Sequence, residues 1–132
     1  MCSIATNATA ETHLKSLASS DDEDSLAEKL KHLAGDSTVQ RAGYLDLPMH
    51  HMHGMPSDLK HIRRVRTGRH RTFYTGHHSQ CSYTVFYIKK FKKTGVKDEL
   101  DKTFHRLLKG AVNDRGEGRT IRRPDPSSEE QS

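Results

Sequence analysis

Three short runs with the alternation of β-strands, all within residues 59–93, constrain the fold more than any other part of the sequence. We expect strands at residues 59–66, 69–75 and 82–90. Thr67 and Gly68 provide a tight turn between the first two, and a longer polar loop follows at residues 76–80. The third run is apolar on both faces, which is typical of a central strand. The sequence therefore predicts a small antiparallel sheet of three to four strands.

The exposed positions of these runs are almost all Arg, Lys, His or Tyr. Residues 58–123 carry 18 Lys and Arg against 6 Asp and Glu, whereas residues 1–57 carry 4 against 8. A sheet with exposed charges of one sign is destabilised by self-repulsion unless it meets a polyanion. Nucleic acid is therefore the first partner that the charge pattern indicates.

The remaining pattern predicts helices on one face of this sheet. Residues 2–6 are expected to form a first strand, and apolar spacing predicts a helical hairpin at about 8–35, with its second helix capped by the segment Ser20–Glu23 and ended by Gly35. A short extended piece is expected near residues 44–47. A C-terminal helix is expected at about 96–111, with Asp98 and Glu99 in its first turn. The fold class is α+β, in a single domain at 1–113, and residues 114–132 are expected to be a disordered tail.

Several classes of protein are not expected from this sequence. It has no apolar stretch of 18 residues and no signal-peptide pattern, so we expect a cytoplasmic chain without a membrane partner. Cys2 and Cys81 are too few for a disulfide framework. His50, His51 and His53 lie close together, but no Cys or carboxylate accompanies them at ligand spacing. We read them as part of a polar loop and expect no metal and no cofactor.

The order of the elements, with three short motifs, resembles the RelE/ParE superfamily of bacterial toxins, and most closely its HigB branch. Residues 64–68 (RVRTG) are similar to a strand and turn of that family. Residues 70–74 (HRTFY) are similar to its next strand, and residues 85–94 (VFYIKKFKKT) to its last strand. The similarity covers residues 59–112 best.

This resemblance implies a RelE-like fold and a type II toxin of a toxin–antitoxin system. Such a toxin is an endoribonuclease that cleaves messenger RNA, usually on the ribosome, and so inhibits translation. Its partners would be mRNA, the ribosome and a cognate antitoxin protein. Many ribosome-dependent members use a Tyr or His near the C-terminus, and this chain has neither after His105. That difference leaves two alternatives open: a ParE-like or inactive member that binds a protein such as gyrase, and a non-toxic module that binds RNA or the ribosome.

A metal-independent ribonuclease needs a base for the 2′-hydroxyl, cations for the charge on the phosphate, and an acid for the leaving oxygen. We assign Arg71 to the phosphate, because its planar fork binds two oxygens at once. Tyr74 is a candidate base-stacking or proton-donating group. The lysines that end the last strand complete the candidate catalytic set, which is Arg71, Tyr74, Lys90, Lys92 and Lys93.

A second group of residues is expected to bind the RNA backbone without choosing a sequence. These candidate RNA-binding residues are Arg63, Arg64, Arg66, Arg69, Lys89, His77 and His78. His70 alternates with Arg71 and is therefore expected on the opposite side of the sheet. Tyr83 and Tyr87 are expected in the core.

Overall fold

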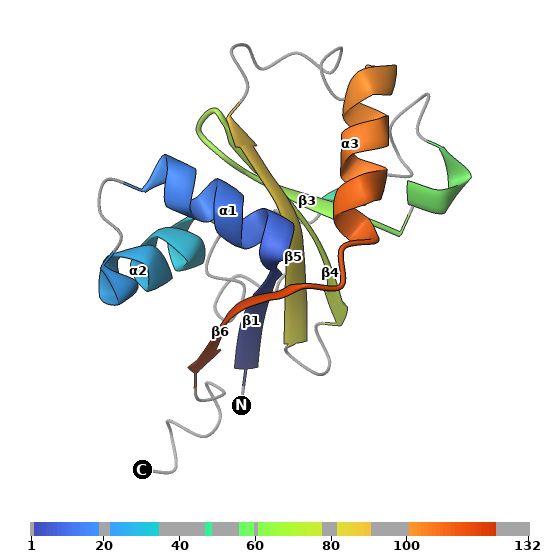
Figure 1. Ribbon diagram of the computed structural model, residues 1–132. Helices are drawn as coiled ribbons and strands as arrows, with labels where there is room; N and C mark the ends of the chain where they lie inside the picture. The colour runs from blue at the N-terminus through green and yellow to red at the C-terminus, as the bar shows by residue number, and fades with distance from the viewer. Residues whose placement is uncertain are drawn as a thin grey trace.

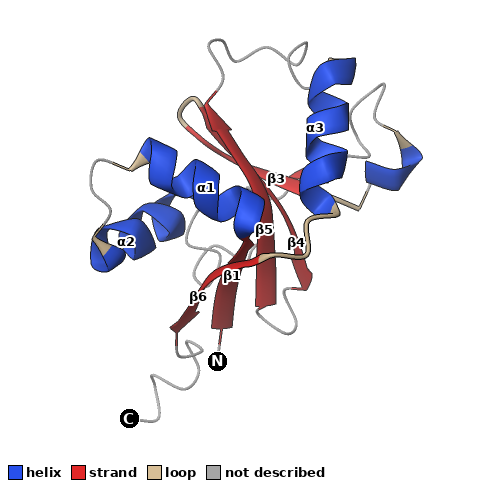
Figure 2. Cartoon of the chain, in the orientation of Figure 1, coloured by secondary structure: helices blue, strands red, loops and turns tan. Residues whose placement is uncertain are grey.

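The computed structural model describes residues 2–18, 22–34, 47–48, 56–59, 61–77, 82–90 and 101–123. Its helices are α1 (Ala8–Leu17), α2 (Glu23–Leu33) and α3 (Lys102–Val112), with a short 3-10 turn η2 (Ser57–Leu59). Its strands are β1 (Cys2–Asn7), β2 (Leu47–Pro48), β3 (Arg63–Thr67), β4 (His70–His77), β5 (Ser82–Lys90) and β6 (Glu117–Arg123). Figures 1 and 2 show these elements. The predicted α+β class, with a helical hairpin and a C-terminal helix, is confirmed.

The sheet is larger than expected and is not wholly antiparallel. Among the described residues it has six strands in the order β2-β3-β4-β5-β1-β6. The hairpin β3–β4 and its neighbour β5 are antiparallel, as predicted. However, β1 runs parallel to its neighbour β5. After β1 the chain passes through α1 and α2 before it reaches β3, which is separated from β1 in the sheet by β5 and β4. The strand predicted at residues 59–66 begins later than expected, at Arg63, because Leu59 belongs to η2.

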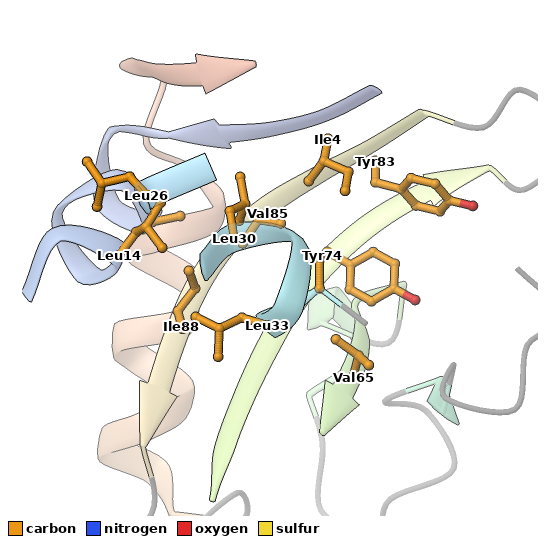
Figure 3. Packing of buried hydrophobic residues seen from close by; sticks show 12 residues of the cluster. Ile4, Leu14, Leu26, Leu30, Leu33, Val65, Tyr74, Tyr83, Val85 and Ile88 are labelled. Carbon is orange, nitrogen blue, oxygen red and sulfur yellow. The ribbon is translucent and has the colours of Figure 1, made fainter. Parts of the chain in front are cut away.

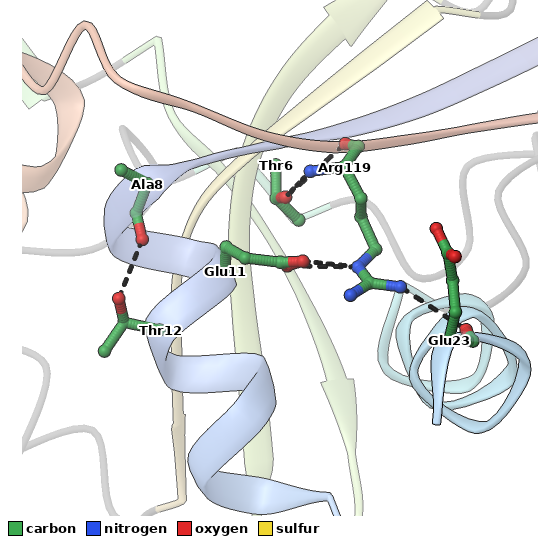
Figure 4. A network of polar contacts seen from close by, with 6 residues as sticks. All are labelled: Thr6, Ala8, Glu11, Thr12, Glu23 and Arg119. Carbon is green, nitrogen blue, oxygen red and sulfur yellow. Dashed lines mark hydrogen bonds and ion pairs between the residues drawn. The ribbon is translucent and has the colours of Figure 1, made fainter. Parts of the chain in front are cut away.

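The C-terminal segment corrects the expectation of a disordered tail. Residues 117–123 form β6, which pairs antiparallel with β1 and covers its outer edge. The backbone N–H of Arg119 donates to Thr6 Oγ1 at 2.9 Å, and its Nε lies 2.5 Å from Glu11 Oε1 of α1. Its Nη1 also donates to the carbonyl of Glu23 in α2 (Figure 4). One arginine therefore connects β6 to both N-terminal helices. Residues 124–132 lie outside the described part of the chain.

Side chains at the helix starts explain where the three helices begin. The Asn7 side chain accepts from the N–H of Ala10, Asp22 accepts from Ser25, and Asp101 accepts from Thr103. The cap of α2 is therefore Asp22 and not Ser20. For α3, the backbone of Asp101 is extended, so the helix begins at Lys102. Gly35 and the predicted start of the last helix, with Asp98 and Glu99, lie outside the described residues.

Helices cover both faces of the sheet, whereas one covered face was expected. On one side, Leu26, Leu30 and Leu33 of α2 pack in a cluster with strand residues that include Val65, Tyr74, Tyr83, Val85 and Ile88 (Figure 3). On the other side, Phe104, Leu108 and Ala111 of α3 pack with Phe73 and Tyr87. We call these sides the α2 face and the α3 face. Helix α1 runs beside β5 beyond the end of β1, and its Leu14 joins the α2-face cluster.

A β-bulge in β5 decides which side chains reach which face. Phe73 of β4 lies opposite Tyr87, and the next residue, Tyr74, lies opposite Val85, so Phe86 is an additional residue in β5. Phe86 and Tyr87 both pack with the α3-face cluster, and Ile88 returns to the α2 face. Because of the bulge, Lys89 lies on the α3 face and Lys90 on the α2 face.

Candidate nucleic-acid interface

Three cationic side chains form a row across the sheet. Arg66 of β3 lies directly opposite Arg71 of β4, and Arg71 lies directly opposite Lys89 of β5. Residues directly opposite each other in an antiparallel pair share one face. Arg71 is two positions from Phe73, and Lys89 is two positions from Tyr87, so this face is the α3 face. We call Arg66, Arg71 and Lys89 the cationic row.

Exposure differs along the cationic row. Arg71 is only 2% exposed, Lys89 is partly buried, and Arg66 is exposed. All three also have contacts within the protein. Like charges directly opposite each other on a sheet destabilise it, and a phosphate between them offsets that repulsion. The row therefore has an almost fully buried guanidinium at its centre and a more accessible cation on each side.

Aromatic rings lie beside the cationic row and hold one end of it. The Phe73 ring lies 5.1 Å from that of Phe104, and the Tyr87 ring lies 5.6 Å from the same Phe104 ring. Lys89 Nζ lies 5.8 Å from the centre of the Phe104 ring, a cation–π distance. These rings are buried, so they position the lysine and leave no ring face on which a base can stack.

No pattern in the sequence singles out His13, yet the structure places it beside this row. His13 Nδ1 accepts a hydrogen bond of 3.3 Å from the backbone N–H of Ile88, and its ring lies edge-on to Tyr87 at 4.5 Å. Burial lowers the pKa of His13, and the charge of Lys89 lowers it further. The neutral imidazole therefore has its Nδ1 occupied and carries its proton on Nε2. In this form Nε2 is able to donate a hydrogen bond, and Nδ1 is already occupied as an acceptor.

Of the predicted site residues, four lie together on the α3 face: Arg71, Arg66, Lys89 and Arg64. Arg64 lies opposite Phe73, in the row next to the cationic row, and is 9% exposed. Arg69 is exposed in the turn between β3 and β4. His77 ends β4, and only its backbone is described. Lys92, Lys93 and His78 lie outside the described residues, so their assignments stay predictions.

The predicted role of Tyr74 is wrong for a physical reason. Tyr74 is three residues from Arg71 in one strand, so it points to the opposite face. There it is 4% exposed and packs edge-on against Tyr83, with ring centres 5.9 Å apart. Arg63, opposite Tyr74, is on the same α2 face. Tyr74 is a core residue and cannot stack on a base bound at Arg71.

Lys90 is also separated from Arg71, because it shares the α2 face with His70, directly opposite it. The predicted position of His70, on the side away from Arg71, is confirmed. Tyr83 and Tyr87 are both buried, as expected. The described members of the predicted catalytic set are thus divided between the two faces of the sheet. Arg71 lies on the α3 face, whereas Tyr74 and Lys90 lie on the α2 face.

The described part of the chain adds no metal-binding cluster and no membrane-spanning helix to these residues. Within the described ranges, no three His, Cys, Asp or Glu side chains gather closely enough to hold a metal ion. His50, His51 and His53 lie outside those ranges. None of the described helices combines the length and apolar character needed to cross a bilayer.

Comparisons of the chain with known protein families, with curated proteins and with solved structures give no match.

Proposed function

We propose that this chain binds RNA through the α3 face of its sheet and is an mRNA endoribonuclease toxin of the RelE/HigB type. The observation that supports this most is the register that aligns Arg66, Arg71 and Lys89 across three strands. A second support is the order of β1, α1, α2, the three strands β3 to β5 and α3, which is the order that the resemblance implies; the short β2 and the C-terminal β6 are additions to it.

In this proposal the cationic row holds the phosphate at which the RNA is cut. The 2′-hydroxyl gives its proton to a base as its oxygen attacks the adjacent phosphorus, and the P–O5′ bond breaks as an acid protonates the 5′-oxygen, which yields a 2′,3′-cyclic phosphate. The Arg71 guanidinium binds two phosphate oxygens, and Lys89 adds a charge that the Phe104 ring holds in place. His13, with its Nε2 proton, is a further donor near Lys89. Lys92 and Lys93 remain candidates for the proton transfers.

RNA binding without cleavage is a second candidate, and a specific observation favours it. Tyr74 is buried on the opposite face, and the Nδ1 atom of His13 is occupied by the Ile88 N–H. Neither group is therefore placed to accept the proton of a 2′-hydroxyl at Arg71. A module of this kind binds RNA or the ribosome through the same cationic row but leaves the RNA intact.

Lys89→Gln and Lys15→Gln form a matched pair that tests both candidates. Lys89 belongs to the cationic row, whereas Lys15 is exposed on α1 and outside it. Wild type and both variants are expressed in growing bacteria, and RNA 5′ ends are mapped across the transcriptome. We expect growth arrest and new ends within translated messages for wild type and Lys15→Gln. Lys89→Gln should lose about tenfold in RNA affinity and most of its cuts.

Four outcomes separate the candidates. Cuts that depend on Lys89 support the nuclease. RNA binding that depends on Lys89, without any new ends, supports the binding module. Arrest with intact messages and DNA damage points instead to a protein target such as gyrase, and an absence of RNA binding by wild type contradicts both candidates.

A further inference from the structure

A second group of cations lies on the α2 face, at the same end of the sheet as the cationic row. Lys90, the last residue of β5, lies directly opposite His70, the first residue of β4. On the other side of His70, Thr67 of β3 lies directly opposite it. The β3–β4 turn and the C-terminal end of β5 therefore lie side by side, at one end of the sheet (Figure 1).

Helix α2 adds two more cationic side chains to this place. The Thr67 hydroxyl donates to the backbone carbonyl of His32 at 3.4 Å, so the end of α2 lies against the turn. Lys29 is one helical turn before His32 and acts electrostatically on the imidazole of His70, as do His32 and Lys90. His70 is partly buried between them. Three elements of the fold thus direct Lys29, His32, His70 and Lys90 to one place.

We propose that Lys29, His32, His70 and Lys90 form a second phosphate-binding subsite for the same RNA strand. This proposal rests on the proposed function. Lys89 and Lys90 are consecutive residues on opposite faces of β5, so the two cationic groups are joined at the end of that strand. The exposed Arg69 lies in the turn beside them. A single strand that leaves the cationic row around this end of the sheet meets the second subsite next.

The electrostatics of the subsite fit an anion. Burial lowers the pKa of His70, and the charges of Lys29, Lys90 and His32 lower it further. In the part of the chain that the structure describes, the groups that act on His70 are those three, and the uncharged Thr67 of β3 lies opposite it. A bound phosphate opposes their repulsion and raises the pKa of His70 again, so binding takes up a proton. RNA affinity should therefore increase as the pH falls through the range in which His70 titrates.

The test compares binding of two uncleavable RNAs. A 2′-O-methylated oligouridylate of about 4 nucleotides covers one subsite, and one of about 12 nucleotides can reach both. The double variant Lys29→Gln/Lys90→Gln removes charge from the second subsite. The control is Lys31→Gln, on the same helix, where Lys31 pairs with Glu28 at 3.1 Å. Thermal unfolding of each variant checks that the fold is kept.

We expect the double variant to bind the longer RNA about tenfold more weakly. The slope of log affinity against log salt concentration should also become smaller, by the amount that corresponds to about two phosphate contacts. Its affinity for the shorter RNA and that of Lys31→Gln should not change. His70→Asn should flatten the rise of affinity between about pH 8 and about pH 5.5. The proposal is overturned if the double variant binds the longer RNA as wild type does while Lys89→Gln weakens it. If wild type binds neither RNA, the proposed function fails as well.

Discussion

Arg71 of β4 and Lys89 of β5 lie directly opposite each other on the α3 face of the sheet, so two cations share one cross-strand pair. A cross-strand pair of like charges costs stability, and here the guanidinium is 2% exposed. Arg66 extends the same row on the other side. This arrangement aligns three basic side chains across three neighbouring strands.

The geometry of the Arg71 side chain should matter more than its charge. Arg71→Lys keeps the charge but loses the planar fork that binds two phosphate oxygens. For the proposed nuclease, we expect the RNA cleavage rate to fall by about 100-fold, with an unfolding temperature within a few degrees of wild type. Single-turnover cleavage of a labelled RNA measures the first and thermal unfolding the second. The matched change Arg66→Lys, at the exposed end of the row, should have a much smaller effect, and equal losses in the two variants would contradict this role for Arg71.

The sequence predicted the strands well and the faces of their side chains less well. Alternation placed Tyr83, Val85 and Tyr87 on one side, but Tyr87 packs on the α3 face because Phe86 is an additional residue in a bulge. A bulge depends on the register with the neighbouring strand, which is not visible in the alternation of a single strand. The same bulge places Lys89 beside Arg71. Strand period alone would have separated Tyr74 from Arg71, since three residues along a strand reverse the face.

β6 was missed because its sequence has almost no hydrophobic signal. The segment EGRTIRR contains a single large apolar residue, Ile121, and reads as a polar tail. It is a strand because the edge of β1 offers unpaired backbone groups and because Arg119 pairs with Glu11 of α1. Both partners are more than a hundred residues away along the chain. Such long-range pairing cannot be inferred from local composition.

His13 should make the stability of the fold depend on pH. Its pKa lies below the ordinary value of 6.5, so between that lower pKa and pH 6.5 the unfolded chain binds a proton that the folded chain does not. Stability is therefore full above about pH 6.5 and falls as the pH drops through this window. His70 contributes in the same direction. His13→Asn keeps an acceptor near Ile88 and removes one titrating group, so its stability should fall less steeply between about pH 7 and about pH 5.

Denaturant unfolding at a series of pH values measures these slopes. His61→Asn, a change of an exposed histidine away from Ile88, is measured beside His13→Asn as the matched control. Identical slopes for wild type and His13→Asn would show that the His13–Ile88 contact does not depend on protonation.

Removal of β6 should destabilise the domain, whereas removal of the residues after it should not. A chain that ends at Asn113 loses the cover of the β1 edge and leaves Glu11 partly buried without Arg119. It also loses Asp114, whose carboxylate accepts from the Thr9 N–H at 3.0 Å. We expect a loss of about 3 kcal/mol or more, seen as a fall of roughly 10 °C or more in unfolding temperature. The matched chain that ends at Arg123 should unfold close to the full-length protein, and equal unfolding temperatures for the two truncations would contradict a structural role for β6.

Gly118 tests the close packing of β6 against β1 and α1, and Gly110 of α3 is its control. A Cβ at Gly118 would lie 2.9 Å from the Asn7 carbonyl oxygen and 2.9 Å from Glu11 Cβ, and would also contact Thr6 Oγ1. Gly118→Ala must therefore push β6 away from the β1–α1 junction and should cost about 1–3 kcal/mol. At Gly110 of α3 a Cβ meets nothing within 4 Å, so Gly110→Ala should stabilise the helix by up to about 1 kcal/mol. Thermal unfolding of the two variants should thus shift in opposite directions, and a Gly118→Ala variant as stable as wild type would show that β6 does not pack this closely.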